Sequence, residues 1–141
     1  MKKKIAAIII LLIIFSPSLP AGAEDFKYAE IFDPKKDAVV KVVQMTPEIN
    51  AMVTDWIMKI KDFYKNDPAT DDGYAVRIPI TPEVKINSRV LNGSINEVYI
   101  IIPEKEPPCF MIFENANKLN SYPFTGDIKL LSKSLGFKLS K

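Results

Sequence analysis

The stretch VKINSRVLNGSINEVYIII at residues 84–102 decides the fold. Its first seven residues alternate between apolar or small side chains and long polar ones, which predicts a half-buried strand. Asn92 and Gly93 both accept positive φ and therefore favour a tight hairpin turn. In the strand that follows, apolar residues occupy both faces, with Tyr99 and Ile101 on one of them. We therefore expect a central strand that is covered on both sides.

Further strands are expected on either side of this hairpin. The segment 38–44 holds four valines and favours a strand, although Asp33 followed by Pro34 could also start a helix there. Residues 81–83 are expected to turn the chain. The remaining candidate strands are the alternating or apolar segments 26–32, 74–80, 109–113 and 118–122.

The pattern at residues 47–65 predicts one long amphipathic helix. Apolar side chains recur at offsets of three and four residues along this whole segment. Thr46 is suited to cap the helix and Pro47 to occupy its first turn. A short helix is expected at 125–135, and Gly136 stands where a left-handed C-terminal cap belongs.

Together these elements predict an α+β domain spanning residues 24–141. We expect an antiparallel meander of four or five strands, with the long amphipathic helix packed on one face and the short C-terminal helix nearby.

Residues 1–23 have the order of parts of a secretory signal peptide. Three lysines precede an uninterrupted apolar run at 5–15, and a small–x–small pattern ends at Ala23. We expect cleavage between Ala23 and Glu24 and a secreted or extracytoplasmic location at the cell envelope. The lysine-rich start and the Ile/Leu core resemble the leaders of Gram-positive bacterial secreted proteins, and this likeness covers the leader alone. The alternative is a leader retained as a membrane anchor, for which the apolar run is short.

The charge of the chain belongs to this leader. The sequence has 19 basic and 17 acidic residues, and residues 1–23 hold three of the basic ones and no acidic one. The domain that remains is slightly acidic, which argues against nucleic-acid binding. The chain has no His, which excludes His-dependent catalysis and His-containing zinc sites. Its one Cys, Cys109, sits in an apolar run and is expected to be a buried, unreactive side chain.

The generic catalytic option is a pair of carboxylates. Asp71 and Asp72 are adjacent, and Glu104 and Glu106 flank a lysine, but neighbours on a loop are more typical of solvated turns. Asp67, Asp71 and Asp72 could offer oxygen ligands to Ca²⁺, although their spacing matches no EF-hand. We expect no catalytic residue, metal ion or cofactor.

The remaining candidates are binding residues. Tyr99, Ile101 and Tyr74 are apolar or aromatic side chains on strands, and an exposed sheet face bearing Tyr99 and Ile101 would be an interface. The sequence therefore predicts a non-catalytic binding or interaction module whose partner is a protein or a cell-wall component. A carboxylate-dependent cell-wall or glycan hydrolase is the alternative.

Overall fold

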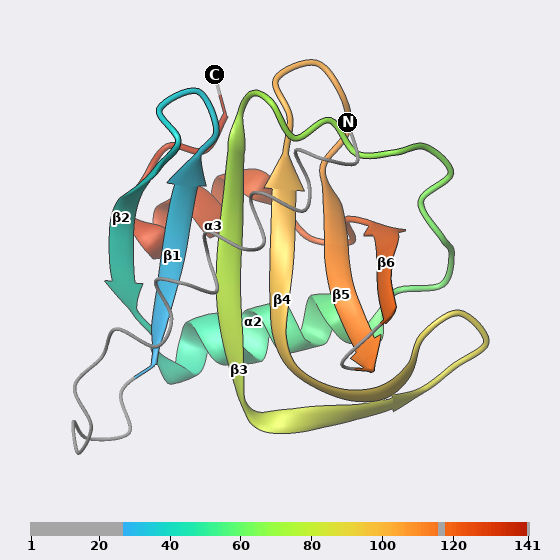
Figure 1. Ribbon diagram of the computed structural model, residues 1–141. Helices are drawn as coiled ribbons and strands as arrows, with labels where there is room; N and C mark the ends of the chain where they lie inside the picture. Colours follow the sequence, from blue (N-terminus) through green and yellow to red (C-terminus); the bar gives the residue numbers. More distant parts are fainter. Residues whose placement is uncertain (1–26, 116–117, 141) are drawn as a thin grey trace.

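The computed structural model describes residues 27–115 and 118–140, which form six strands and two helices (Figure 1). The expected cleavage site between Ala23 and Glu24 and the rest of the leader lie outside the described residues. The elements are β1 (Tyr28–Asp33), β2 (Ala38–Gln44), α2 (Pro47–Met58), β3 (Tyr74–Asn87), β4 (Asn92–Ile102), β5 (Cys109–Asn115), β6 (Lys118–Pro123) and α3 (Ile128–Leu135).

All six strands form one antiparallel sheet in the order β2-β1-β3-β4-β5-β6. Strands β3 to β6 follow one another as hairpins, but α2 carries the chain from β2 past β1 to β3 (Figure 1). The expected meander of four or five strands with one long helix is therefore wrong. The domain is mostly antiparallel sheet with two short helices. The sequence pattern missed the adjacency of β1 and β3 because local periodicity does not specify which strands pair.

Helix α2 is much shorter than the predicted 47–65. It starts as expected, because the Thr46 hydroxyl oxygen accepts a hydrogen bond from the Ile49 N–H at 3.1 Å and Pro47 occupies the first turn. It ends at Met58, where the Thr125 hydroxyl donates a hydrogen bond to the Trp56 carbonyl. That carbonyl is one that a longer helix would have satisfied internally.

The apolar periodicity beyond Met58 reflects packing of another kind. Ile60 remains in the core at 5% exposure. The backbone N–H of Tyr64 donates to the Ser121 carbonyl at 2.9 Å, so the chain runs along the free edge of β6. Apolar residues that seemed to extend the helix instead help to cover a sheet edge, where unpaired backbone groups would otherwise remain.

The β3–β4 hairpin also turns at a different place from the one predicted. Asn92 and Gly93 lie within β4, paired with Asn87 and Ile86, and the turn is formed by residues 88–91. The Ser88 N–H donates to the Leu91 carbonyl at 3.0 Å and closes this turn. Gly93 is required for another reason, since a Cβ there would lie 2.7 Å from the Glu114 carbonyl oxygen. The predicted turn at 81–83 is an irregularity within the continuous strand β3.

Several local predictions are confirmed. The segment 38–44 is a strand, and α3 ends at Gly136 with φ 63° and ψ 34°, in the left-handed conformation. Asp127 caps the start of α3 by accepting hydrogen bonds from the Lys129 and Leu130 N–H groups. Neither helix in the described part of the chain is long and apolar enough to cross a membrane.

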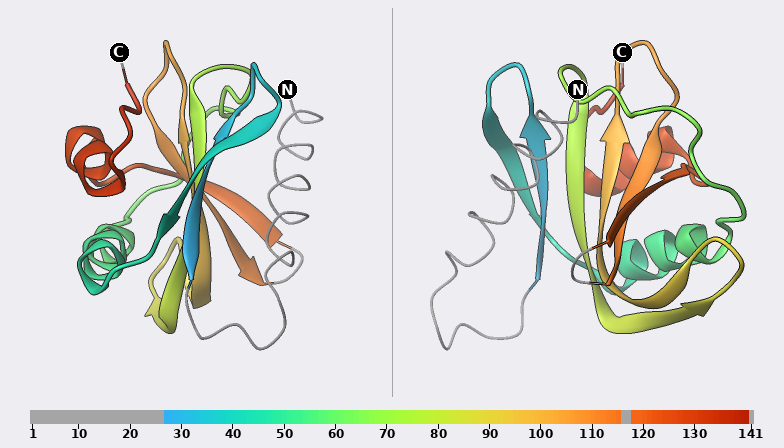
Figure 2. Two further views of the ribbon diagram at one scale, coloured as in Figure 1. Left: turned by 90° about the vertical axis from the view of Figure 1, so that its left-hand side faces the viewer. Right: turned by 45° about the vertical axis from the view of Figure 1, so that its right-hand side comes forward.

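Both helices lie on the same side of the sheet (Figure 2). The inner cluster is the apolar core between them and the sheet, and its largest members include Trp56, Tyr122, Phe110, Ile100 and Ile57. The outer cluster lies on the opposite face and consists of Phe32, Ala75, Tyr99, Ile101, Cys109 and Met111. Strand β4 contributes to both clusters, which confirms the prediction of a central strand buried on both faces.

Candidate functional site

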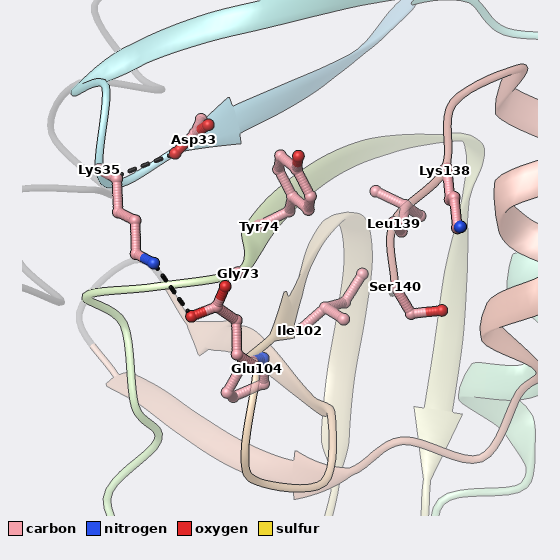
Figure 3. A pocket seen from close by; sticks show the side chains of 10 residues that line it. Asp33, Lys35, Gly73, Tyr74, Ile102, Glu104, Lys138, Leu139 and Ser140 are labelled. Carbon is pink, nitrogen blue, oxygen red and sulfur yellow. Dashed lines mark hydrogen bonds and ion pairs between the residues drawn. The ribbon is translucent and has the colours of Figure 1, made fainter.

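One end of the sheet carries a hollow of about 560 Å³ (Figure 3). Because neighbouring strands are antiparallel, the end of β1, the start of β3 and the end of β4 meet there. The C-terminal segment after α3 closes the hollow on another side. The residues that line this end hollow are Asp33, Lys35, Gly73, Tyr74, Ile102, Pro103, Glu104, Lys138, Leu139 and Ser140.

The apolar part of the end hollow is rigidly held. The Tyr74 ring meets the Phe137 ring edge to face, with centroids 5.1 Å apart and an interplanar angle of 89°. Leu139 is buried, and its N–H donates to the Ser132 hydroxyl oxygen at 3.1 Å, which ties the C-terminal segment to α3. The hollow therefore offers a fixed aromatic ring beside aliphatic side chains.

Gly73 makes this arrangement possible. Its φ of 65° lies in the left-handed region, and a Cβ there would lie 1.8 Å from the Ile102 carbonyl oxygen. The chain can therefore enter β3 against the end of β4 only without a side chain at this position.

The acidic side chains of the hollow are engaged by the protein itself. Asp33 Oδ1 accepts hydrogen bonds from the backbone N–H groups of Lys35 at 2.9 Å and Lys36 at 3.3 Å. Lys35 Nζ lies 3.1 Å from Glu104 Oε2, and the Glu104 N–H donates to Asp72 Oδ1 at 3.0 Å. The hydrogen bond and the charge of Glu104 raise the pKa of Lys35. Since the Lys35 side chain is 61% exposed, this ion pair is weak and can exchange for a ligand.

Lys138 is the other cation of the hollow. In Figure 3 it stands on one side of the Tyr74 ring and Lys35 on the other. Within residues 27–115 and 118–140, the Lys138 ammonium group has no hydrogen-bond or ion-pair partner. This cation is therefore available to an anionic group that enters the hollow.

The structure separates the three residues predicted to bind. Tyr74 lines the end hollow and packs against the inner cluster. Tyr99 and Ile101 lie together on the outer face, where they are only 1% and 3% exposed. Tyr99 and Ile101 are therefore buried rather than exposed, and Tyr74 does not join them; a binding role for these residues stays a prediction.

The outer face also holds a row of charged side chains. Arg77 Nη1 lies 2.9 Å from Glu30 Oε1, and Arg77 Nε lies 2.7 Å from Glu97 Oε1. The Tyr99 hydroxyl donates to Glu97 Oε2 at 3.2 Å. Burial raises the pKa of Glu30, and this effect outweighs the opposing attraction and hydrogen bond of Arg77. Burial, with a smaller contribution from the Glu97 charge, raises the pKa of Tyr99.

Cys109 is a buried structural thiol, as predicted. It is 1% exposed, and burial raises its pKa to about 12, with a further contribution from the Glu106 charge. The thiolate that nucleophilic chemistry requires is therefore scarce at neutral pH.

The carboxylates considered at first do not form a metal cluster. Across the described ranges 27–115 and 118–140, no group of three or more His, Cys, Asp or Glu side chains is placed to hold a metal ion. Asp72 instead accepts the hydrogen bond from Glu104 that shapes the end hollow.

The sequence pointed to Tyr74 as a binding residue and to Glu104 only as a candidate carboxylate, and it gave no signal for Lys35 and Lys138. Lys35, Glu104 and Lys138 come from the β1–β2 turn, the β4–β5 turn and the C-terminal segment, so no spacing in the sequence links them. The topology alone brings them together.

No family model matches the chain, and neither a curated protein nor a solved structure matches it.

Proposed function

We propose that this chain is a small exported binding module, secreted or held at the cell envelope, that takes a ligand in the end hollow without chemical conversion. The observation that carries the proposal is the juxtaposition in one hollow of the Tyr74 ring with the Lys138 ammonium group, which has no ion-pair partner among the described residues. The volume of about 560 Å³ is within the range of small-molecule sites.

The lining favours a ligand that combines a ring with an anionic group. Tyr74 is held by Phe137 and offers a ring face at little entropic cost. Lys138 supplies a positive charge for the anionic group. Lys35 can supply a second positive charge when its ion pair with Glu104 breaks. An acidic sugar from a cell-wall polymer has this chemistry and agrees with an extracytoplasmic location.

The hydrolase alternative receives less support from the geometry. Hydrolysis by two carboxylates needs an acid and a base that both face the substrate. In the end hollow, Asp33 holds the β1–β2 turn through two backbone N–H groups, and Glu104 pairs with Lys35. Both carboxylates therefore already serve structural contacts, which favours binding over catalysis.

The experiment compares two sugars that differ by one carboxylate. N-acetylmuramic acid carries a lactyl carboxylate that N-acetylglucosamine lacks. We expect N-acetylmuramic acid to shift the backbone amide NMR signals of residues 73–74, 102–104 and 138–140, and N-acetylglucosamine to shift them at higher concentration only. A charge-assisted hydrogen bond from Lys138 would contribute about 1.5–3 kcal/mol.

Matched variants locate the binding energy. Lys138→Met should remove the preference for the acidic sugar, whereas Lys133→Met, at an exposed position on α3, should leave it unchanged. Tyr74→Ala should weaken the binding of both sugars. This function would be refuted if neither sugar shifted the amide signals of the residues that line the hollow. It would also be refuted if the Lys138→Met variant kept the full preference for N-acetylmuramic acid.

The retained-anchor alternative needs a separate measurement, because residues 1–23 lie outside the described structure. We expect mass spectrometry of the exported protein to give an N-terminus at Glu24. A chain that retains residues 1–23 in the membrane fraction would instead establish a tethered module with the same hollow.

A further inference from the structure

The two edges of the sheet differ in what covers them. At the β6 edge, the loop after α2 donates the Tyr64 N–H to the Ser121 carbonyl at 2.9 Å. At the other edge, β2 pairs with β1, and no strand within residues 27–115 and 118–140 pairs with its outward side. In the left view of Figure 2 this β2 edge faces the viewer, and both helices lie to one side of it. The described part of the chain therefore protects one edge and leaves the other without a partner strand.

The register identifies the backbone groups that face outward from β2. The Met45 N–H donates to the Lys27 carbonyl at 2.8 Å, so Met45 faces the β1 side. Backbone direction alternates along an antiparallel strand, and the register with β1 is regular at this end of β2. Val43 therefore also faces β1, whereas the N–H and C=O groups of Val42 and Gln44 face away from it.

The side chains agree with an open edge at this point. Val42 is 55% exposed in the full chain, and Gln44 is exposed as well. Edge strands are commonly protected by a charged side chain that repels a second strand. The one charged residue of β2 is Lys41, and its Nζ donates to the Gly136 carbonyl at 2.8 Å, on the side of the sheet that carries the helices. The outward groups of Val42 and Gln44 therefore have no charge in front of them from β2 itself.

We propose that two copies of this chain pair edge to edge through β2, antiparallel about a two-fold axis at Val43. In this register, Val42 of each copy lies opposite Gln44 of the other, and the outward groups of both residues form about four hydrogen bonds. An axis nearer the start of β2 would include the bulge, where Val40 has no partner on β1. The regular end of β2 is therefore the part that pairs.

A second copy fits this edge because the edge complements itself. A closed pair about a two-fold axis needs the same surface on both partners, and two outward residues on either side of the axis meet this condition. Val43 and Met45 are partly buried against the inner cluster. In the pair, Val43 meets Val43 of the second copy, and Met45 lies opposite the aliphatic part of Lys41. The apolar inner layer therefore continues across the junction, and no like charges face each other.

The pairing leaves the end hollow untouched. No residue of β2 lines the hollow, so this inference is independent of the proposed ligand. The result of the pairing is one continuous sheet across both copies, with the helices of both copies on the same side.

Backbone amide exchange in the full chain tests the pairing without any substitution. We expect the Val42 and Gln44 N–H groups to exchange at least about tenfold more slowly at a protein concentration where sedimentation shows a dimer than at one where it shows a monomer. The Val43 N–H, which faces β1, should be protected at both concentrations. A monomer at every concentration would overturn the proposal. Protection of Val42 and Gln44 in the monomer would also overturn it, because the chain itself would then cover the edge.

Two substitutions at one position separate backbone pairing from side-chain contact. Val42→Pro removes an outward N–H but no hydrogen bond to β1, a position at which edge strands tolerate proline, and should weaken the dimer at least about tenfold. Val42→Thr keeps the N–H and the β-branched shape, and should change the dimer constant by less than about threefold. The proposal is wrong if Val42→Pro dimerises like the unmodified chain, or if Val42→Thr loses the dimer to the same extent.

The fluorescence of Trp56, the only tryptophan, shows whether the proline variant keeps its core. If its emission is red-shifted, Gln44→Pro replaces it, because that substitution removes the other outward N–H. The same weakening of the dimer is expected, and an unchanged dimer constant would overturn the proposal.

Discussion

Replacement of Arg77 by Met tests the account of the charged row on the outer face. In the Arg77→Met variant, Glu30 and Glu97 lose their shared cation, and the Glu30 side chain is only 8% exposed. Breaking a fully buried ion pair costs about 3–5 kcal/mol, and an exposed pair less than about 1 kcal/mol. Because Arg77 is 15% and Glu97 26% exposed, we expect a loss of about 2–3 kcal/mol at neutral pH. With an unfolding entropy of about 0.24 kcal/mol/K for a domain of this size, Tm should fall by roughly 8–12 °C.

The pH dependence makes this prediction specific. The folded-state pKa of Glu30 is raised above its ordinary value of 4.5, so stability falls as pH rises through that pKa. Arg77 lowers the Glu30 pKa by its charge and its hydrogen bond, and its removal raises this pKa further. The destabilisation should therefore be large at about pH 7.5 and should shrink at about pH 4, where Glu30 is protonated.

The assay is thermal unfolding by circular dichroism at both pH values. Arg89→Met is the matched control, because Arg89 is exposed and its replacement should change Tm by less than about 2 °C. The reasoning would be refuted if Arg77→Met lowered Tm no more than Arg89→Met does. It would also be refuted if the fall in Tm were equal at both pH values.

Four further substitutions test the packing and the cap of α2. Ile100 lies in the centre of β4 with a side chain that is 0% exposed, so Ile100→Ala should lower the free energy of unfolding by about 3–4 kcal/mol in chemical denaturation. The control Val42→Ala, at a side chain that is 55% exposed, should lower it by less than about 0.5 kcal/mol. Similar losses of stability in the two variants would contradict the assigned core. Gly126→Ala would place a Cβ 2.2 Å from the Trp56 ring, so the emission maximum of Trp56 should move, and an unchanged spectrum would argue against this contact. Thr46→Ala should cost about 1 kcal/mol in the same unfolding assay by removing the cap of α2, and a neutral result would show that the cap is not needed.

Local chemistry predicted those elements whose signals are contained within a few residues. The Thr46 cap, the valine-rich strand β2 and the Gly136 terminus all follow from backbone preferences that act over one turn or one strand. The buried face of α2 was also predictable, since its apolar residues repeat with the helical period.

The errors arose where a distant segment supplied a contact. At the end of α2 the Trp56 carbonyl accepts the Lys59 N–H and also the hydroxyl of Thr125, which lies 69 residues away in the sequence. Gly93 seemed a turn residue, but it is needed because the Glu114 backbone passes close to it. The end hollow has the same origin, because only the strand order brings Lys35 and Lys138 beside Tyr74.

The passage of α2 over β1 has a consequence for the order of folding. The β1–β2 pair and the β3–β6 series each form between strands that are adjacent in the chain, whereas β1 joins β3 across a separation that reaches 47 residues at the Glu30–Arg77 contact. Closing a long loop costs more entropy than closing a hairpin, so we expect the two local units to form first and the β1–β3 pairing to form last. By the same reasoning, we expect the β1–β3 pairing to open before the rest of the sheet when the folded domain fluctuates.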